Sequence, residues 1–190
     1  MWFLLRLLGS IALAIVLGLG SAYVAAFSLR GDSQLRNGPW QTNLLIGSST
    51  ADPYIKTYIA LTGLLALNKS ETLYFEAHED SAGKPLDGKC SYRIDGKDPD
   101  ARWWSLTVYG SDHFLLPNPA KRYSVTKTNV LRTADGTFSM RLSTTPEEGN
   151  WIPTSENGFE LTLRLYNPGD SVRDKPEAVA LPSITREACS

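Results

Sequence analysis

The chain has 190 residues, of which 42% are hydrophobic and 21% are charged. This length and composition fit one globular domain of ordinary size and exclude a disordered or collagen-like protein. The 19 basic and 20 acidic residues give a net charge of -1. That balance argues against a nucleic-acid-binding protein, because neutralising phosphates requires an excess of lysine and arginine. The two cysteines are too few for a zinc ribbon or a disulfide-dense small fold.

Residues 1–30 are predicted to form a transmembrane anchor, because the stretch from Leu7 to Phe27 carries no charge. A helix of about 20 residues, rising about 1.5 Å per residue, crosses a hydrocarbon core of about 30 Å. A cleaved signal peptide is the alternative, with Val24 and Ala26 as the small residues before the cut. The apolar core of a signal peptide is usually shorter, about 7–15 residues, so the uncleaved anchor is favoured.

The orientation of this anchor does not follow from its flanking charges, because Arg6 precedes the stretch and Arg30 and Arg36 follow it. Without residues 1–30 the chain keeps 17 bases and 20 acids, a net charge of -3. A mildly acidic domain has no overall electrostatic attraction to an anionic lipid surface.

Residues 31–190 are predicted to be one mainly β domain with a single packed helix. A polar lead-in over 31–51 contains an apolar patch around Trp40. Asp52 can cap a following helix, Pro53 suits its first turn, and 54–67 carries a wide apolar face. Such a face must be buried against another element, most simply a sheet.

The hydrophobic period changes to two after this helix, which is typical of strands with one buried face. Turn signals such as Asp135-Gly136 separate the apolar runs. Short strands in this spacing predict an antiparallel sandwich or barrel. The expected strands are 72–79, 89–95, 102–109, 123–127, 137–143, 159–166 and 182–188.

The second half of the chain contains four distinctive motifs, Arg102–Tyr109, Phe114–Pro119, Asn150–Pro153 and Phe159–Pro168. In order and spacing they resemble the bacterial "domain of unknown function 1214" family. The lead-in Gly38-Pro39-Trp40 and the helix resemble the short, membrane-anchored branch of that family. The resemblance implies a β-sandwich of jelly-roll type, a place in the bacterial envelope, and a companion protein of the "domain of unknown function 1254" family. It implies no agreed reaction and no agreed catalytic residues.

The aromatic and arginine side chains of these motifs are interpreted first as packing residues, because aromatic side chains dominate core energetics. Arg102 and Arg164 are expected to pair with acids on neighbouring strands, and 150–153 is expected to be a loop pinned by Trp151. The alternative is an aromatic-lined pocket. Its candidate binding residues are Trp103, Tyr109, Trp151, Arg164 and Tyr166.

Catalytic motifs such as HExxH, GxSxG and a Walker loop are missing from the sequence, and no cofactor or metal is predicted. Glu76 and His78 share a strand face, and with His113 or Asp112 they would give nitrogen and oxygen ligands for a divalent metal. The simpler interpretation is a solvated strand end. His113 could also act as an acid–base group beside Asp112, against the simpler interpretation of an exposed loop histidine.

Cys90 and Cys189 are expected to form a disulfide if the domain lies outside the cytoplasm, because exported cysteine pairs usually oxidise. Two unrelated thiols are the alternative. The expected disulfide and the family resemblance both favour a domain on the periplasmic side of the cytoplasmic (inner) membrane.

Two functions remain open at this stage. The first is a membrane-anchored envelope protein that serves as a binding or accessory module for a partner protein or an apolar ligand. The second is a periplasmic hydrolase, with or without a bound metal, that uses Glu76, His78 and His113. Convergence of these three side chains in a pocket would favour the hydrolase, and wide separation of the two histidines would remove its support.

Overall fold

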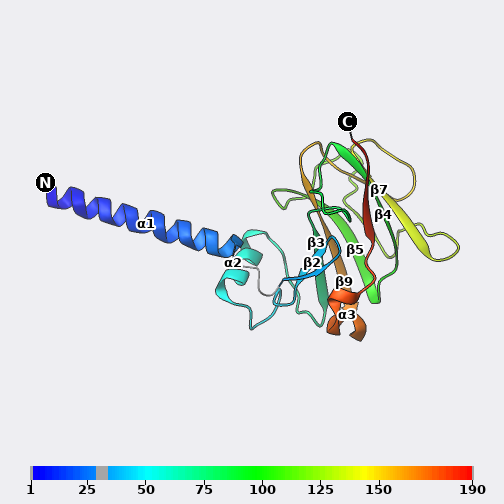
Figure 1. Cartoon of the computed structure of the whole chain (residues 1–190), viewed down its shortest axis with the longest axis horizontal. Coiled ribbons are helices and arrows are strands. Elements are labelled where there is room, and N and C mark those ends of the chain that lie inside the picture. The colour runs from blue at the N-terminus through cyan, green and yellow to red at the C-terminus, as the bar shows by residue number, and fades with distance from the viewer. Residues whose placement is uncertain (1, 29–33, 190) are drawn as a thin grey trace.

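The computed structural model describes residues 2–28 and 34–189. A long N-terminal helix projects from a body built of two β-sheets, and the carboxy terminus lies on that body (Figure 1). The predicted boundary between anchor and domain at residues 30 and 31, with Arg30, lies outside the described residues. The expectation of a mainly β protein with an N-terminal apolar helix is confirmed.

Helix α1 (Trp2–Ser28) is continuous and surrounded by solvent along most of its length. Its apolar stretch, Trp2–Ala26, reaches a mean hydropathy of 2.2 in its most apolar part, and none of the residues there is buried. A core helix of a soluble protein would be buried instead. The helix is therefore compatible with a single-pass membrane anchor or with a signal peptide.

The strands form two sheets. The six-stranded sheet is antiparallel throughout, and the four-stranded sheet contains one parallel pair, β7 with β8. The first sheet has the order β1 (Gln34–Asn37), β2 (Trp40–Asn43), β3 (Thr72–Ala77), β9 (Phe159–Pro168), β5 (Ala101–Gly110), β6 (Ser124–Thr126). The second has the order β10 (Ser183–Cys189), β4 (Cys90–Lys97), β7 (Thr137–Ser143), β8 (Trp151–Pro153).

The hydrophobic core lies between the two sheets. On the six-stranded sheet, Leu163 of β9 is paired with Phe75 of β3 on one side and with Leu106 of β5 on the other, and all three are buried. Aromatic rings cross the gap, because Trp104 of β5 lies 5.3 Å from Phe138 of β7 between ring centroids. Alternate residues of each strand therefore supply the core, as the period of two predicts.

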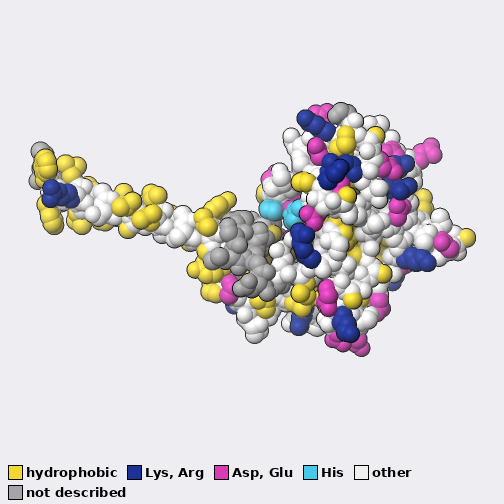
Figure 2. Space-filling model, viewed as in Figure 1, with side chains coloured by type: hydrophobic (Ala, Val, Ile, Leu, Met, Phe, Trp, Pro, Cys, Tyr) yellow, Lys and Arg dark blue, Asp and Glu magenta, His cyan; other side chains and the backbone are white. Residues whose placement is uncertain are grey.

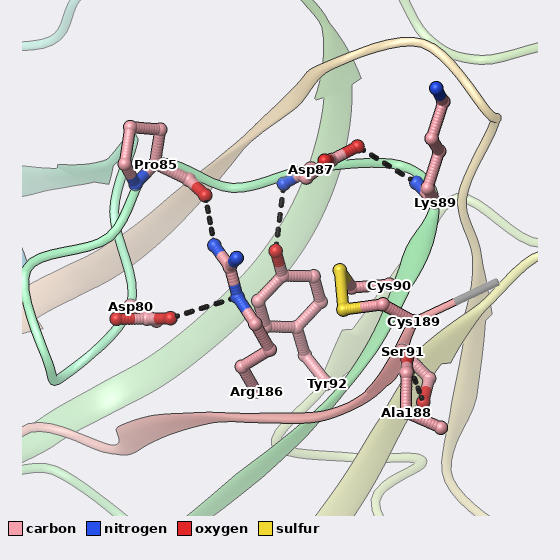
Figure 3. The surroundings of a disulfide bond; sticks show 10 residues. All are labelled: Asp80, Pro85, Asp87, Lys89, Cys90, Ser91, Tyr92, Arg186, Ala188 and Cys189. Atoms are coloured by element: carbon pink, nitrogen blue, oxygen red, sulfur yellow. Dashed lines mark hydrogen bonds and ion pairs between the residues drawn. A yellow bond between two sulfur atoms is a disulfide. The ribbon is translucent and has the colours of Figure 1, made fainter.

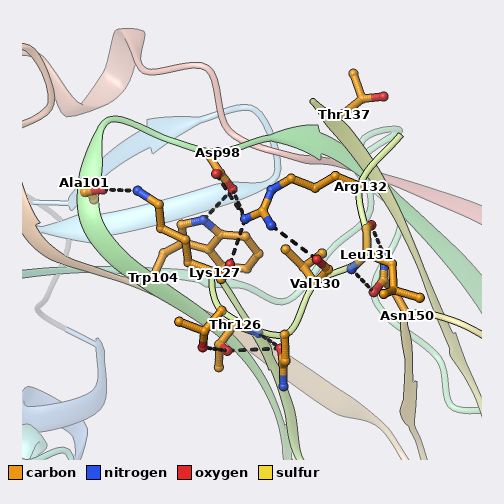
Figure 4. Close-up of polar contacts among 12 residues, drawn as sticks. Asp98, Ala101, Trp104, Thr126, Lys127, Val130, Leu131, Arg132, Thr137 and Asn150 are labelled. Atoms are coloured by element: carbon orange, nitrogen blue, oxygen red, sulfur yellow. Dashed lines mark hydrogen bonds and ion pairs between the residues drawn. The ribbon is translucent and has the colours of Figure 1, made fainter. Parts of the chain in front are cut away.

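A polar cluster closes one end of this core (Figure 4). The indole Nε1 of the buried Trp104 donates to Asp98 Oδ1 at 2.9 Å, and Arg132 Nη2 donates to the same oxygen at 2.8 Å. Lys127 Nζ donates to the Ala101 carbonyl at 2.8 Å. The buried indole nitrogen thus has an ionised acceptor, which avoids the cost of an unpaired buried donor.

The expected disulfide between Cys90 and Cys189 is present and ties β10 to β4 (Figure 3). Close to it, the Tyr92 hydroxyl accepts a hydrogen bond from the Asp87 amide at 2.7 Å. Burial raises the pKa of Tyr92 above its ordinary value of 10.0, because the charged phenolate would lose its hydration. Arg186 lies over the Tyr92 ring, and its Nε is 3.1 Å from the buried Asp80 carboxylate. The carboxy-terminal strand is therefore held by covalent, polar and aromatic contacts together.

The helix predicted over 54–67 is shorter, since α2 covers Pro53–Leu61. Asp52 caps its start as expected, with Oδ1 accepting from the Tyr54 and Ile55 amides. Its end is a glycine cap that the prediction overlooked. Gly63 has φ +66, and the Leu64 amide donates back to the Ile59 carbonyl at 3.2 Å. Glycine in this left-handed position ends helices, so the apolar residues beyond it are not helical.

Three strands were absent from the prediction. The lead-in contains the β1–β2 hairpin, which turns at Gly38 with φ +58. Trp40 of that hairpin is buried, and its Nε1 donates to the Pro182 carbonyl at 2.7 Å. The segment expected to be a loop at 150–153 contains β8, which pairs in parallel with β7. These strands are three or four residues long, which is too short for a pattern of alternation to show.

Two short helical segments follow β9. They are α3 (Asp170–Asp174) and the 3-10 turn η2 (Pro176–Ala178), and they connect the six-stranded sheet to β10. Asn37 of β1 donates from its amide group to the Val179 carbonyl at 2.7 Å. The connection is thereby attached to the edge of the six-stranded sheet.

Candidate functional site

The outer face of the six-stranded sheet, which points away from the core, buries polar side chains. Thr72, Tyr74, Ser105, Thr107 and Thr162 on this face are each at most 7% exposed. The segment after α2 covers part of it, because the Leu67 amide donates to the Tyr74 hydroxyl at 2.9 Å. Burial of hydroxyl groups in place of apolar side chains distinguishes this face from an ordinary packing surface.

A small cavity of about 60 Å³ lies between this outer face and the end of α2. It has room for several water molecules or one small polar group. Its walls are Tyr58, Thr62, Gly63 and Leu64 on the helix side and Glu76, Tyr109, His113, Glu160, Thr162 and Arg164 on the sheet side.

The two histidines of the described chain meet at one carboxylate. His113 Nδ1 lies 2.7 Å from Glu160 Oε1, and His78 Nδ1 lies 3.4 Å from Glu160 Oε2. His78 Nε2 lies 3.9 Å from Oε2 of Glu76, which is two residues earlier in the chain, on β3. Because a carboxylate accepts hydrogen bonds, the contact with Glu160 favours the tautomer of His113 that carries its proton on Nδ1 and leaves Nε2 as the acceptor nitrogen.

Three elements bring these groups together. Glu76 points outward from β3, Glu160 points outward from the start of β9, and His113 lies in the loop after β5. His113 has a backbone φ of +65. Residues other than glycine adopt this left-handed conformation at some cost in free energy, and it often marks a functional position. The Asp112 Oδ1 atom accepts from the Phe114 amide at 3.0 Å and so stabilises the loop. Asp112 is therefore a turn residue and not the alternative third ligand that the sequence suggested.

Gly110 permits this loop. A Cβ atom on Gly110 would lie 2.7 Å from Asp112 Oδ1 and 3.1 Å from Leu116 Cδ2. The Gly110 amide donates to the Phe114 carbonyl at 2.8 Å, which closes the turn. A side chain at this position would therefore require the Asp112 carboxylate and the Leu116 side chain to move.

Arg164 contributes a cation to the cavity. Its Nη2 donates to the Tyr109 hydroxyl at 2.9 Å, and its Nη1 lies 3.4 Å from Thr107 Oγ1. Its guanidinium carbon lies 5.4 Å from the centroid of the Tyr109 ring and 6.0 Å from that of Tyr74. No acid among residues 2–28 and 34–189 forms an ion pair with Arg164, which corrects the expectation of an acidic partner on a neighbouring strand.

The remaining aromatic candidates lie elsewhere. Trp103 and Tyr166 contact each other, with ring centroids 5.1 Å apart, at the opposite end of the outer face. Trp151 belongs to the other sheet, where it is 6% exposed and its Nε1 donates to Ser143 Oγ at 3.0 Å. Of the five candidate binding residues, the structure brings only Tyr109 and Arg164 to the cavity.

Glu160 is the residue that sequence reasoning missed. It occupies one of the outward positions of the strand expected at 159–166, but it lies 47 residues from His113 along the chain. A charged residue in the outer row of a central strand was the available signal. In the part of the chain that is described, no three His, Cys, Asp or Glu side chains are placed to hold a metal ion.

Comparison with known proteins gives a family and a fold. Residues 71–170 match the family described as "Protein of unknown function (DUF1214)". The crystal structure of VPA0106 from Vibrio parahaemolyticus is 25% identical with a TM-score of 0.61, over 73% of this chain and 36% of that chain. An uncharacterised protein from Burkholderia cenocepacia is 17% identical with a TM-score of 0.47, over 90% of this chain and 41% of that chain. The chain thus spans little more than a third of VPA0106. A search of curated proteins found no match.

Proposed function

The chain belongs to the DUF1214 family of proteins of unknown function, and from this premise we propose that it is a membrane-anchored binding module. Its α1 would hold the β body on the periplasmic side of the inner membrane, and its ligand would enter the cavity beside Arg164. A jelly-roll connectivity and a companion protein of the DUF1254 family are part of the proposal, on the ground of family resemblance.

The proposal rests on the hydrogen-bond partners of the Arg164 guanidinium group. The guanidinium lines the cavity, and within the described residues its hydrogen-bond acceptors are the neutral hydroxyl groups of Tyr109 and Thr107. Arginine has five donors arranged to grip a carboxylate or phosphate, and a partly buried one is usually paired with an anion. The matching ligand carries an anionic group, so we replace the expected apolar ligand with an anionic one.

Two observations support the proposed location. The Cys90–Cys189 disulfide fits an oxidising compartment, and α1 fits a single membrane span. The location is tested by alkylating thiols in intact cells before lysis. A periplasmic body predicts that both cysteines resist alkylation until a reductant is added. Rapid alkylation of both without reductant would contradict it.

The binding proposal is tested on the full-length chain extracted from bacterial membranes in mild detergent. Native mass spectrometry would identify a retained small anion, and calorimetry would measure its affinity. Arg164→Gln is expected to weaken binding by roughly 10- to 100-fold, because a hydrogen bond to a charged group contributes about 1.5–3 kcal/mol.

The matched control is Arg102→Gln, which removes an exposed arginine from β5 outside the cavity. It should leave affinity unchanged. Equal weakening by both variants would show that the anion binds through general surface charge, and retention of full affinity by Arg164→Gln would refute the proposed site.

A second function is favoured by one specific observation, the contact of both histidines with Glu160. A carboxylate that orients the Nδ1–H of an imidazole leaves Nε2 able to take a proton from water or a hydroxyl group. This arrangement supports a hydrolase that uses His113 as general base. The nucleophile would be water, because no described serine or cysteine lines the cavity.

This second function is tested with ester and phosphoester substrates on the full-length chain. His113→Gln should abolish turnover, and Glu160→Gln should lower kcat more than it changes KM, because the carboxylate orients the base without binding substrate. His78→Gln is the internal comparison and should have a smaller effect. Turnover that survives His113→Gln would exclude this mechanism.

A further inference from the structure

Exposed apolar side chains gather on one small part of the body. Outside α1, seven large hydrophobic side chains are exposed in the described residues, and four of them lie between residues 54 and 67. These four form the surface that we call the α2 patch: Tyr54 at 47% exposed, Leu61 at 61%, Leu65 at 92% and Leu67 at 43%. Two others, Phe114 and Leu115, follow His113 in the cavity loop. Such a concentration points to an interaction surface.

The α2 patch lies next to the end of α1. Helix α2 packs beside α1, and Figure 1 shows it at the carboxy-terminal end of that helix. Ala26, in the last turns of α1, is 2% exposed, so this end is seated on the body. Figure 2 shows apolar side chains on the surface at this junction. If α1 spans a bilayer, the patch is held within reach of the headgroups, because α1 leaves the hydrocarbon core at this end.

The local charge has the sign that an anionic membrane attracts. Residues 53–70 contain two lysines, Lys56 and Lys69, and no acid. Neither lysine forms an ion pair with a described acid, although Lys56 Nζ donates to the Ser49 carbonyl at 3.3 Å. Within residues 31–190, whose net charge is -3, this apolar segment with two lysines and no acid lies between Asp52 and Glu71. Basic and apolar residues together bind anionic lipid surfaces.

The patch is held in a defined conformation. Gly47 has φ +74, and a Cβ atom on it would lie 1.9 Å from the Leu67 carbonyl oxygen. The backbone before α2 and the backbone after it are therefore in contact. Leu65 and Leu67 are held to the outer face of the sheet by their backbone bonds to the Tyr74 hydroxyl. Their exposed side chains therefore project from a supported backbone.

We propose that the α2 patch lies in the interface of the bilayer that carries α1, with Tyr54, Leu61 and Leu65 among the lipid headgroups. This inference rests on the proposed membrane anchorage, but not on the ligand. Residues 62–64 form the outer wall of the cavity. Contact between the patch and lipid therefore places the cavity beside the headgroup layer.

Photocrosslinking on the full-length chain tests the proposal in phosphatidylcholine–phosphatidylglycerol vesicles. The crosslinker p-benzoylphenylalanine replaces Leu65 in one sample and Leu131 in another. Leu131 is also exposed and apolar, at 64%, but lies in the loop before β7. A third sample carries it in place of Leu17 in the middle of α1. Lipid adducts are expected at positions 17 and 65 and not at 131.

Each other outcome overturns the proposal in a distinguishable way. Adducts at 17 but not at 65 would mean that α1 is a membrane anchor and the patch does not touch lipid. Protein–protein adducts at 65 would assign the patch to another chain, and missing adducts at 17 would refute the anchorage itself. Equal lipid adducts at 65 and 131 would show unspecific collisions.

Charge substitutions provide a second readout. The double variant Lys56→Gln, Lys69→Gln should lower the adduct yield at position 65 by up to about fivefold per lysine in vesicles that contain phosphatidylglycerol. In phosphatidylcholine alone the same variant should change nothing. If the double variant gave the same adduct yield as the chain with both lysines in the phosphatidylglycerol vesicles as well, the lysines would not contribute to lipid contact. That part of the proposal would then be refuted.

Discussion

Strands β3, β9 and β5 bury both of their faces, but the two faces bury different chemistry. The inner row of Phe75, Leu163 and Leu106 is entirely apolar and each residue is at most 1% exposed. The outer row of Tyr74, Arg164 and Thr107 is polar, and two of its members are also buried. The inner row is held by apolar contacts alone, whereas in the outer row Arg164 also makes hydrogen bonds to Thr107 and to the neighbouring Tyr109 and a ring contact to Tyr74.

The difference shows which face contributes to stability and which is available for function. Burial of apolar area stabilises a fold directly, whereas burial of hydroxyl groups and a cation costs free energy unless every partner is supplied. Buried hydroxyl groups and a buried cation therefore contribute less to stability than apolar side chains would in the same positions. The outer face, with its cavity and histidine–glutamate cluster, is therefore the part of the body to which we assign the proposed function.

The largest effect is expected on the inner face. Phe75→Ala should lower the free energy of unfolding by about 3–5 kcal/mol, because it removes a fully buried ring and leaves a cavity. Thermal and chemical unfolding of the full-length chain in detergent would measure it. Tyr54→Ala, at a position 47% exposed, should change stability by no more than about 0.5 kcal/mol. Similar losses for both would contradict the location of the core.

On the outer face, Tyr109→Phe should affect binding more than folding. It removes the hydroxyl that accepts from Arg164 Nη2 at 2.9 Å and keeps the ring. A lost hydrogen bond of this kind costs about 1 kcal/mol, so the affinity for the anionic ligand should fall roughly fivefold. Calorimetry measures the affinity, with Tyr166→Phe as the control at the other end of the face. A large loss of stability without loss of affinity would assign Tyr109 a structural role.

A buried hydroxyl on the same face should be replaceable at a gain. Thr72 is 1% exposed and its Oγ1 has no hydrogen-bond partner in the described part of the chain. Thr72→Val keeps the shape and removes the unpaired group, so stability should rise by up to about 1 kcal/mol. Chemical unfolding would measure the gain. A loss instead would mean that the hydroxyl has a partner that the valine cannot replace.

The smallest effect lies outside both faces, in the turn before β7. Hydrogen bonds from the side chains of Thr133 and Thr137, and from the Thr137 amide, hold the pKa of Asp135 well below its ordinary value of 3.8. The ionised group therefore stabilises the fold above that value, and its contribution is lost as the pH falls below it. The Tm difference between the native chain and Asp135→Asn should be constant above about pH 5 and should shrink in more acidic buffer. A difference that does not change with pH would contradict the assignment.

Sequence reasoning succeeded where the signal is local. The strand at 137–143 matches β7 residue for residue, because the alternation of Phe138, Met140 and Leu142 is itself the buried face. It failed where one residue changes the backbone or where an element is very short. Gly63 ended α2 earlier than the apolar period indicated, and β8 paired in parallel over three residues. The glycine was visible in the sequence and could have been interpreted as a helix cap.

By itself the sequence determined an apolar helix long enough to span a bilayer, seven of the ten strands in the described residues, and a pair of cysteines suited to a disulfide. These depend on composition, period and count, which need no knowledge of neighbours. Only the tertiary structure decided that His78, Glu160 and His113 meet, that Arg164 bonds to Tyr109, and that exposed leucines lie beside α1. Strand order and register place such residues together, and both depend on how the whole chain packs.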